Sequence, residues 1–197
     1  MRAGLGFQAR TGWAALVAVA GPAEAPSVAL RRRVELVDDT IPAHVYHAAQ
    51  EARDPRPLLK EAAQCARTAG RRAVREAVRE LERAGHQVVG MGLGVGSGTV
   101  PDDLEAILAS HARVHAAEGE FYRRVLIEAG EHNGLRVIRL PRKEIDRAAA
   151  RELGVGSAGL QKQLAAMGRE AGAPWRKEQK EAAVAAWVAL RAPGRSR

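Results

Sequence analysis

Two histidines and a glutamate fall on one side of a helix predicted from residue 101 to about residue 129. At about 100° per residue, His111, His115 and Glu118 lie within an arc of about 60°. Imidazoles at positions i and i+4, followed by a carboxylate one turn later, can chelate zinc or another transition metal. The same spacing suits a His–Glu pair in acid–base catalysis. The segment therefore predicts a polar site for metal binding or proton transfer.

The side of the helix that carries these groups also carries large apolar residues, namely Leu104, Ile107, Tyr122 and Val125. Because an apolar stripe of this kind faces the core, we expect the two imidazoles and the carboxylate to point inward. Buried polar groups are costly without partners, so they must bond to one another, to another element or to a ligand. A satisfied hydrogen-bond network in the core is the alternative to a metal site. His47, which follows Tyr46, is a further candidate contributor.

The rest of the chain predicts a mixed sheet covered by helices. Apolar and alternating runs predict strands over residues 3–20 (with a bend at 9–12), 28–37, 87–95 and 135–140. Longer periodic segments predict helices over residues 58–84, 101–129, 145–153, 160–171 and 176–190. Residues 40–57, which include three prolines, predict a loop. Early strands in a hairpin, followed by strand–helix–strand crossovers, are typical of an α/β fold.

The length of 197 residues is enough for one domain. We expect a single domain over residues 1–190, followed by a basic tail over residues 191–197 that is disordered. The single Cys65 excludes a disulfide framework and favours a reducing, cytoplasmic location. The apolar run at residues 12–21 is too short to cross a membrane.

Two motifs at opposite ends of the chain resemble those of a known family. The first strand contains Gly6-Phe7-Gln8-Ala9-Arg10-Thr11-Gly12, and the last helix contains Glu178-Gln179-Lys180-Glu181-Ala182. Together with the order of elements, these motifs resemble the ribonuclease-H-like superfamily, and most of all the RuvC-type Holliday-junction resolvases. Those enzymes begin with G-[IV]-D-x-G and end with a helix bearing D-x-x-D-A. The resemblance covers most of the chain and implies a ribonuclease-H-like mixed sheet flanked by helices.

The resemblance also implies a catalytic centre, which this chain carries in altered form. The family uses four carboxylates to hold two divalent metals. Gln8 stands where the first Asp is expected, and the predicted strand 87–95 contains no acid. Glu178 and Glu181 match acidic positions, although Glu is also common at an exposed helix start. The fold would bring Gln8 and Glu181 near His111 and His115, so the candidate catalytic residues are Gln8, His111, His115, Glu118, Glu178 and Glu181.

The formal net charge of +8 favours a polyanionic partner. Arg71, Arg75 and Arg79 recur every four residues along the predicted helix 58–84, where they could follow a phosphate backbone. With Arg10 of the first strand, they are the candidate nucleic-acid-binding residues. A solvated, salt-bridged helix face is the alternative interpretation.

Three functions are compatible with these features. The first is a divergent RuvC-like protein that binds or processes nucleic acid, DNA rather than RNA, with an altered two-metal site. The second is a metal-dependent hydrolase in which His111, His115 and Glu118 bind the ion, whether Mg²⁺, Mn²⁺ or Zn²⁺. The third is a non-catalytic scaffold, and a homo-oligomer is compatible with each of them.

Overall fold

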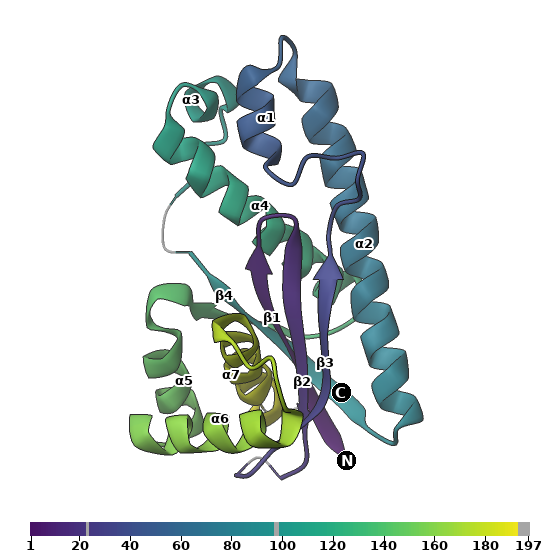
Figure 1. The fold of residues 1–197 in the computed structure, drawn as a ribbon, viewed down its shortest axis with the longest axis vertical. Helices are drawn as coiled ribbons and strands as arrows, with labels where there is room; N and C mark the ends of the chain where they lie inside the picture. Colours follow the sequence, from purple (N-terminus) through teal and green to yellow (C-terminus); the bar gives the residue numbers. More distant parts are fainter. Residues whose placement is uncertain (23, 97–98, 193–197) are drawn as a thin grey trace.

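The computed structural model describes residues 1–22, 24–96 and 99–192. Its centre is one five-stranded sheet with the strand order β3-β2-β1-β4-β5 (Figure 1). The strands are β1 (Arg2–Arg10), β2 (Trp13–Ala20), β3 (Ser27–Glu35), β4 (Gln87–Val95) and β5 (Val137–Pro141). β1, β2 and β3 pair antiparallel, and β4 pairs parallel with both β1 and β5. The predicted hairpin and mixed sheet are therefore confirmed.

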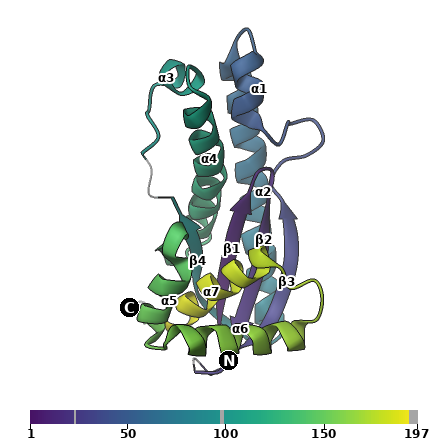
Figure 2. The ribbon, with the colours of Figure 1, turned by 60° about the vertical axis from the view of Figure 1, so that its left-hand side comes forward.

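Helices cover both faces of this sheet (Figure 2). They are α1 (Val45–Glu51), α2 (Pro55–Arg83), α3 (Leu104–Leu108), α4 (His111–His132), α5 (Ile145–Leu153), α6 (Ser157–Ala171) and α7 (Lys177–Arg191), with a 3-10 turn at Arg142–Glu144. Leu5 and Phe7 of β1 belong to the core under α2 and α4. Ala15 and Val17 of β2 belong to the opposite core, under α5, α6 and α7. The α/β class expected from the sequence is confirmed.

α7 lies directly on the backbone of the central strands. A Cβ atom added at Gly6 of β1 would collide with the carbonyl oxygen of Ala182, and one at Gly92 of β4 would collide with that of Ala185. At Gly4, the added atom would meet the backbone nitrogen of Leu190 at 2.6 Å. The small residues of both strands therefore allow the close approach of α7. This packing fixes the start of α7 at the carboxyl ends of β1 and β4.

The loop predicted over residues 40–57 is wrong in its middle, where α1 forms. The backbone N–H groups of Val45, Tyr46 and His47 donate to the carboxylate of Glu118, which comes from α4. Because the first N–H groups of a helix have no partner within it, this distant carboxylate stabilises a helix of only 7 residues. No local pattern in the proline-containing segment indicates such a cap.

The single helix predicted over residues 101–129 is also wrong, because α3 and α4 are separate. Asp103 caps α3 by accepting from the backbone N–H groups of Glu105 and Ala106. Gln50 donates to the carbonyl oxygen of Leu108 at the end of α3, and Ser110 then adopts an extended conformation. α1, α3 and the first turns of α4 extend beyond the end of the sheet (Figure 1).

The end of the predicted domain is held by contacts with the rest of the fold, among them one from Arg2 to the carbonyl oxygen of Ala192. Arg191, which was assigned to the basic tail, is the last residue of α7 and donates to the carbonyl oxygen of Leu153. Residues 193–197 lie outside the described residues. Among the helices that the structure describes, none combines the length and the apolar character needed to cross a membrane.

Candidate functional site

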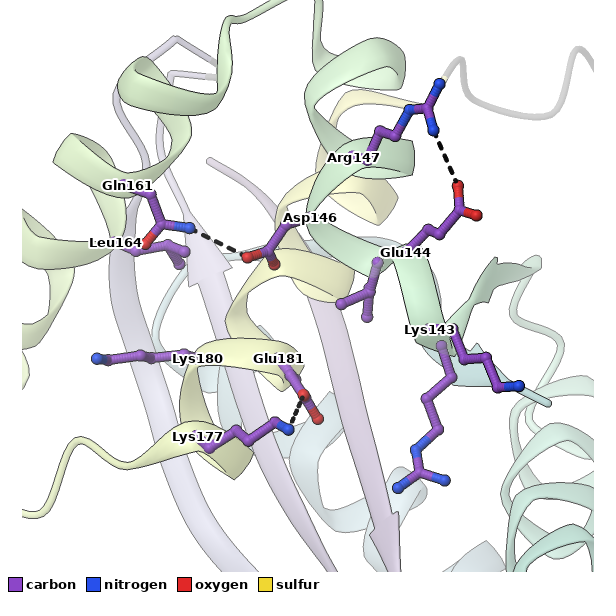
Figure 3. A pocket seen from close by; sticks show the side chains of 11 residues that line it. Lys143, Glu144, Asp146, Arg147, Gln161, Leu164, Lys177, Lys180 and Glu181 are labelled. Atoms are coloured by element: carbon purple, nitrogen blue, oxygen red, sulfur yellow. Dashed lines mark hydrogen bonds and ion pairs between the residues drawn. The ribbon is translucent and has the colours of Figure 1, made fainter. Parts of the chain in front are cut away.

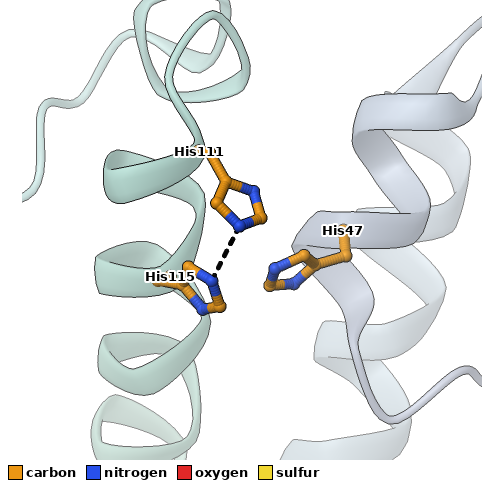
Figure 4. A group of neighbouring side chains, drawn as sticks. All are labelled: His47, His111 and His115. Atoms are coloured by element: carbon orange, nitrogen blue, oxygen red, sulfur yellow. Dashed lines mark hydrogen bonds between the residues drawn. The ribbon is translucent and has the colours of Figure 1, made fainter.

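Three histidines converge where α1 meets the beginning of α4. His47 of α1 and His111 and His115 of α4 each offer a ring nitrogen, and the three nitrogens lie within 4.8 Å of one another (Figure 4). The Nε2 atoms of His111 and His115 are 3.0 Å apart. The ring centroid of His47 lies 4.6 Å from that of His115 and 5.5 Å from that of His111. We call these residues the three-histidine cluster.

Glu118 contacts this cluster through His47 and is not one of its three members. Its side chain is 2% exposed, and besides the three N–H groups of α1 it contacts the Nδ1 atom of His47 at 3.1 Å. His44 also lies near this carboxylate, so that His44, His47 and Glu118 form a second group with converging ligand atoms. Glu118 therefore orients the His47 ring and leaves its Nε2 atom facing the other two histidines.

The expected inward orientation is correct for Glu118 and wrong for the two α4 histidines. His111 and His115 are exposed. They lie on the part of α4 that extends beyond the sheet, where α1 is the element packed against it. Leu104 and Ile107, which defined the predicted stripe, belong to α3 instead. The stripe therefore joined two helices with different axes.

The carboxylate candidates occupy a different place, at the start of α7 next to the end of β1. Gln8 is 2% exposed and lies on the same side of β1 as Gly4 and Gly6, which face α7. Glu178 accepts from Arg10 at 2.6 Å. Its own backbone N–H lowers the pKa of the Glu178 carboxyl most, partial burial opposes this, and Arg10 lowers it further. Because Arg10 follows Gln8 by two residues, this ion pair lies beside the end of β1 that carries Gln8.

Glu181 faces an open cavity of about 840 Å³ between α5, α6 and α7 (Figure 3). It pairs with Lys177 at 3.6 Å. Asp146 also lines the cavity and accepts from Gln161 at 3.1 Å. The cavity is lined by five basic residues, Arg142, Lys143, Arg147, Lys177 and Lys180, and by three acidic residues, Glu144, Asp146 and Glu181. We call it the basic cleft.

A smaller cavity of about 140 Å³ lies between the two regions. Arg10, Arg123 and Arg142 line it together with His44, His115 and Glu118. Arg142 also lines the basic cleft, so both cavities share one side chain. The six candidate catalytic residues therefore form two groups at one end of the molecule, with arginines between them.

Of the comparisons with known proteins, the one with solved structures found proteins of similar architecture. No protein-family model matches the chain, and the search of curated proteins found no match. Among solved structures, RuvC of T. thermophilus in complex with a Holliday junction substrate matches with a TM-score of 0.51 and 11% identity, over 95% of this chain and 92% of that chain. A second Thermus thermophilus RuvC structure matches with a TM-score of 0.51 and 12% identity, over 94% of this chain and 92% of that chain.

This chain has a RuvC-like, ribonuclease-H-like fold. The resemblance seen in the first strand and the last helix is thus confirmed for the fold. At this level of identity the likeness concerns the fold, and it assigns no activity to particular residues.

The residues at the start of α7 do not fit the two-metal centre that the RuvC resemblance implies. Divalent magnesium or manganese prefers several carboxylate oxygens. Gln8 offers a neutral carboxamide, Glu178 is already paired with Arg10, and Glu181 is paired with Lys177. Among the described residues, no group of three converging ligands includes either glutamate. In the described part of the chain, this edge therefore lacks the donor set that a two-metal reaction needs.

The four candidate nucleic-acid-binding arginines do not share one surface of the RuvC-like fold. Arg10 lies beside Glu178, near α7. Arg71, Arg75 and Arg79 belong to α2, which covers the opposite face of the sheet. Arg75 and Arg79 are exposed, whereas Arg71 is half-buried. A ligand in the basic cleft would therefore not contact the α2 arginines, whose role stays a prediction.

The sequence did not single out Arg142, Lys143 or Lys180. Among the described residues, these three form no ion pair, whereas Arg147 pairs with Glu144 at 3.7 Å. A usable signal existed, because Arg142 and Lys143 directly follow β5. The carboxyl ends of parallel strands share one edge of a sheet, and ligands bind there in open α/β folds.

Proposed function

We propose that this RuvC-like protein binds nucleic acid, branched DNA in particular, at the basic cleft and does not cleave it by the two-metal mechanism. The observation that supports this most is the position of the cleft. It lies at the carboxyl ends of β1, β4 and β5, where open α/β sheets bind their ligands. The RuvC structure described with a Holliday junction substrate shares this fold over nearly the whole chain.

The charge distribution supports a polyanionic ligand. Five basic side chains line the cleft, and Arg142 also lines the neighbouring small cavity, where the charges of Arg10 and Arg123 are paired with Glu178 and Glu120. Arg142, Lys143 and Lys180 have no acidic partner among the described residues, so their charges are free to neutralise phosphates. Such contacts release counterions, which makes the binding sensitive to salt.

The side chains at the start of α7, beside the cleft, do not offer the several free carboxylates that two divalent ions need. Glu178 and Glu181 each have a basic partner, and Gln8 carries no charge. We therefore expect the protein to bind nucleic acid without cleaving it, because it lacks the pair of metal ions that would activate water.

The test is the binding of a labelled four-way DNA junction, a duplex and a single strand, each measured as a function of salt concentration. We expect the junction to bind most tightly. Replacing Arg142, Lys143 and Lys180 by Ala should weaken junction binding at least about tenfold, and it should reduce the slope of log K against log salt by about 0.9 per lost phosphate contact.

The matched control is the double variant Arg75→Ala/Arg79→Ala on α2. Both side chains are exposed and belong to the opposite face, so we expect less than a twofold change in affinity. Equal losses in the two sets would contradict binding at the cleft, and no junction binding at low salt would overturn the proposed function. Junction cleavage by the wild-type protein that requires Mg²⁺ or Mn²⁺ would overturn the non-cleaving assignment.

A further inference from the structure

We propose that His47, His111 and His115 form a binding site for one zinc ion, with Glu118 as the outer carboxylate that orients His47. The site would be separate from the carboxylates at the start of α7, and its test does not depend on the proposed nucleic-acid binding. Its ligands come from α1 and α4, which lie on the other side of the sheet from α7. Three lines of structural observation support it.

The first is the geometry of the ring nitrogens. Ligand atoms that are each about 2.0–2.1 Å from a tetrahedral zinc ion lie about 3.3 Å from one another. The Nε2 atoms of His111 and His115 are 3.0 Å apart, and the nitrogen of His47 lies within 4.8 Å of both. Small rotations of exposed rings therefore suffice to place all three nitrogens around one ion. The three rings point toward one another in Figure 4.

The second is the outer carboxylate. Histidines that bind metals usually donate their other ring N–H to a carboxylate or carbonyl oxygen, which fixes the tautomer and the ring plane. Glu118 takes this position at 3.1 Å from Nδ1 of His47. Because Glu118 also accepts from three backbone N–H groups of α1, it holds the whole helix in place, and with it the third ligand.

The third is the chemistry of the donors. Three neutral imidazoles suit zinc, nickel and copper, and they suit magnesium poorly. The contact between the Nε2 atoms of His111 and His115 does not include the third ring, that of His47, which contacts Glu118 instead. Three histidines leave the fourth zinc position for water or an anion. The neighbouring small cavity, which His115 and three arginines line, is where such an anion would enter.

α4 supplies three of the four functional groups from successive turns. His111 and His115 are one turn apart and bind the ion, and Glu118, one turn further on, recruits His47 from α1. The sequence suggested His111, His115 and Glu118 as the three ligands, and the proposed site changes one of them. The glutamate orients a ligand, and the third ligand comes from a segment more than sixty residues earlier.

The test uses the full chain freed of metal with a chelator and then titrated with Zn²⁺ by calorimetry and with Co²⁺ by absorption spectroscopy. We expect one equivalent of either ion, a tetrahedral Co²⁺ spectrum, and no saturable binding of Mg²⁺. His111→Ala and His115→Ala should each weaken Zn²⁺ binding by more than the about 10–100-fold that loss of an outer partner costs. Both side chains are exposed, so these variants should keep the melting temperature of the metal-free protein.

His44→Ala and His132→Ala are the matched controls, and both should retain wild-type affinity. His132 lies on α4 outside the cluster, and His44 belongs to the second group with Glu118. Loss of binding in His44→Ala with retention in His111→Ala would overturn the proposed ligand set in favour of that second group. Absence of saturable binding to the wild-type protein would overturn the site altogether.

Discussion

The three-histidine cluster and the start of α7 lie at the same end of the sheet. They differ in whether the side chains that could bind a metal already have a charged partner. At α7, each glutamate has a basic partner, Arg10 for Glu178 and Lys177 for Glu181. At the cluster, His111 and His115 contact each other through their Nε2 atoms, and His47 contacts the buried carboxylate of Glu118. The carboxylates at the start of α7 are thus neutralised by basic side chains, whereas the ring nitrogens of the cluster remain available to a metal ion.

In this chain, the contacts that stabilise the fold and those that position the candidate ligands therefore come from separate segments. The contact of α7 with Gly6 and Gly92 maintains the RuvC-like architecture. The arrangement of α1 and α4 around Glu118 maintains the histidines. Each contact can be broken on its own, and the following variants separate the two regions in order of expected effect.

Gly6→Ala is expected to have the largest effect. The added methyl group would collide with the backbone of α7 at Ala182, and a backbone cannot move aside as a side chain can. We expect a loss of about 3 kcal/mol in the free energy of unfolding, measured by urea denaturation. Zn²⁺ binding by the folded fraction should persist, because α1 and α4 supply the cluster and neither of them contains Ala182.

The matched control for that variant is Gly159→Ala in α6. The nearest atom to the added methyl group is the Cβ of Val155 at 3.7 Å, which is an ordinary contact. Since Ala favours helices over Gly by up to about 1 kcal/mol, Gly159→Ala should be slightly stabilising. Equal destabilisation by both changes would contradict the role given to the close approach of α7.

Glu118→Ala is expected to cost about 2 kcal/mol, because it leaves three backbone N–H groups at the start of α1 without their acceptor. Thermal or urea unfolding measures this loss. Glu131→Ala, also on α4, removes an exposed side chain paired with Arg139 and should change stability by less than about 0.5 kcal/mol.

Glu118→Gln separates support of the helix from orientation of the histidine. It keeps an oxygen acceptor for α1 but removes the charge that polarises His47. If Glu118 is a positioning residue, Zn²⁺ affinity should fall about 10–100-fold while the tetrahedral Co²⁺ spectrum is retained. An unchanged affinity would show that the carboxylate serves α1 alone.

Glu178→Gln is expected to have the smallest effect. The pKa of Glu178 lies below its usual value of 4.5 in the folded chain, so its charged form stabilises the fold above that pH. This contribution disappears as the pH falls through the lowered pKa. The wild-type protein should therefore exceed the variant by at most about 1 kcal/mol at neutral pH, and unfolding curves should converge in acid. A constant difference at all pH values would contradict the ion pair with Arg10.

Much of the fold was predictable because its signals are local. Alternating apolar residues gave the strands, and Gly6 and Glu178 lie in motifs that resemble a known family. The histidine spacing at positions 111 and 115 was also visible. His47 was a further candidate, but its position beside them was not predictable, because α1 is stabilised by a carboxylate that is distant in sequence. The basic cleft was missed since Arg142 and Lys180 meet only after β5 and α7 are packed together.

The error about the histidines' exposure has the same origin. Leu104 and Ile107 extended the apolar stripe of the predicted helix, but the chain turns at Ser110 and starts a new helix axis. Periodicity describes one continuous helix, and it says nothing about where the sheet beneath that helix ends. Beyond that end, His111 and His115 of α4 face α1 and solvent.

The claim that metal-binding geometry lies at the histidines and not at α7 is tested most directly by anomalous diffraction from crystals soaked in Zn²⁺ and, separately, in Mn²⁺. The account predicts one zinc peak between the Nε2 atoms of His47, His111 and His115, and no peak of either metal between Gln8, Glu178 and Glu181. A pair of manganese peaks beside Glu178 and Glu181, with none at the histidines, would contradict it.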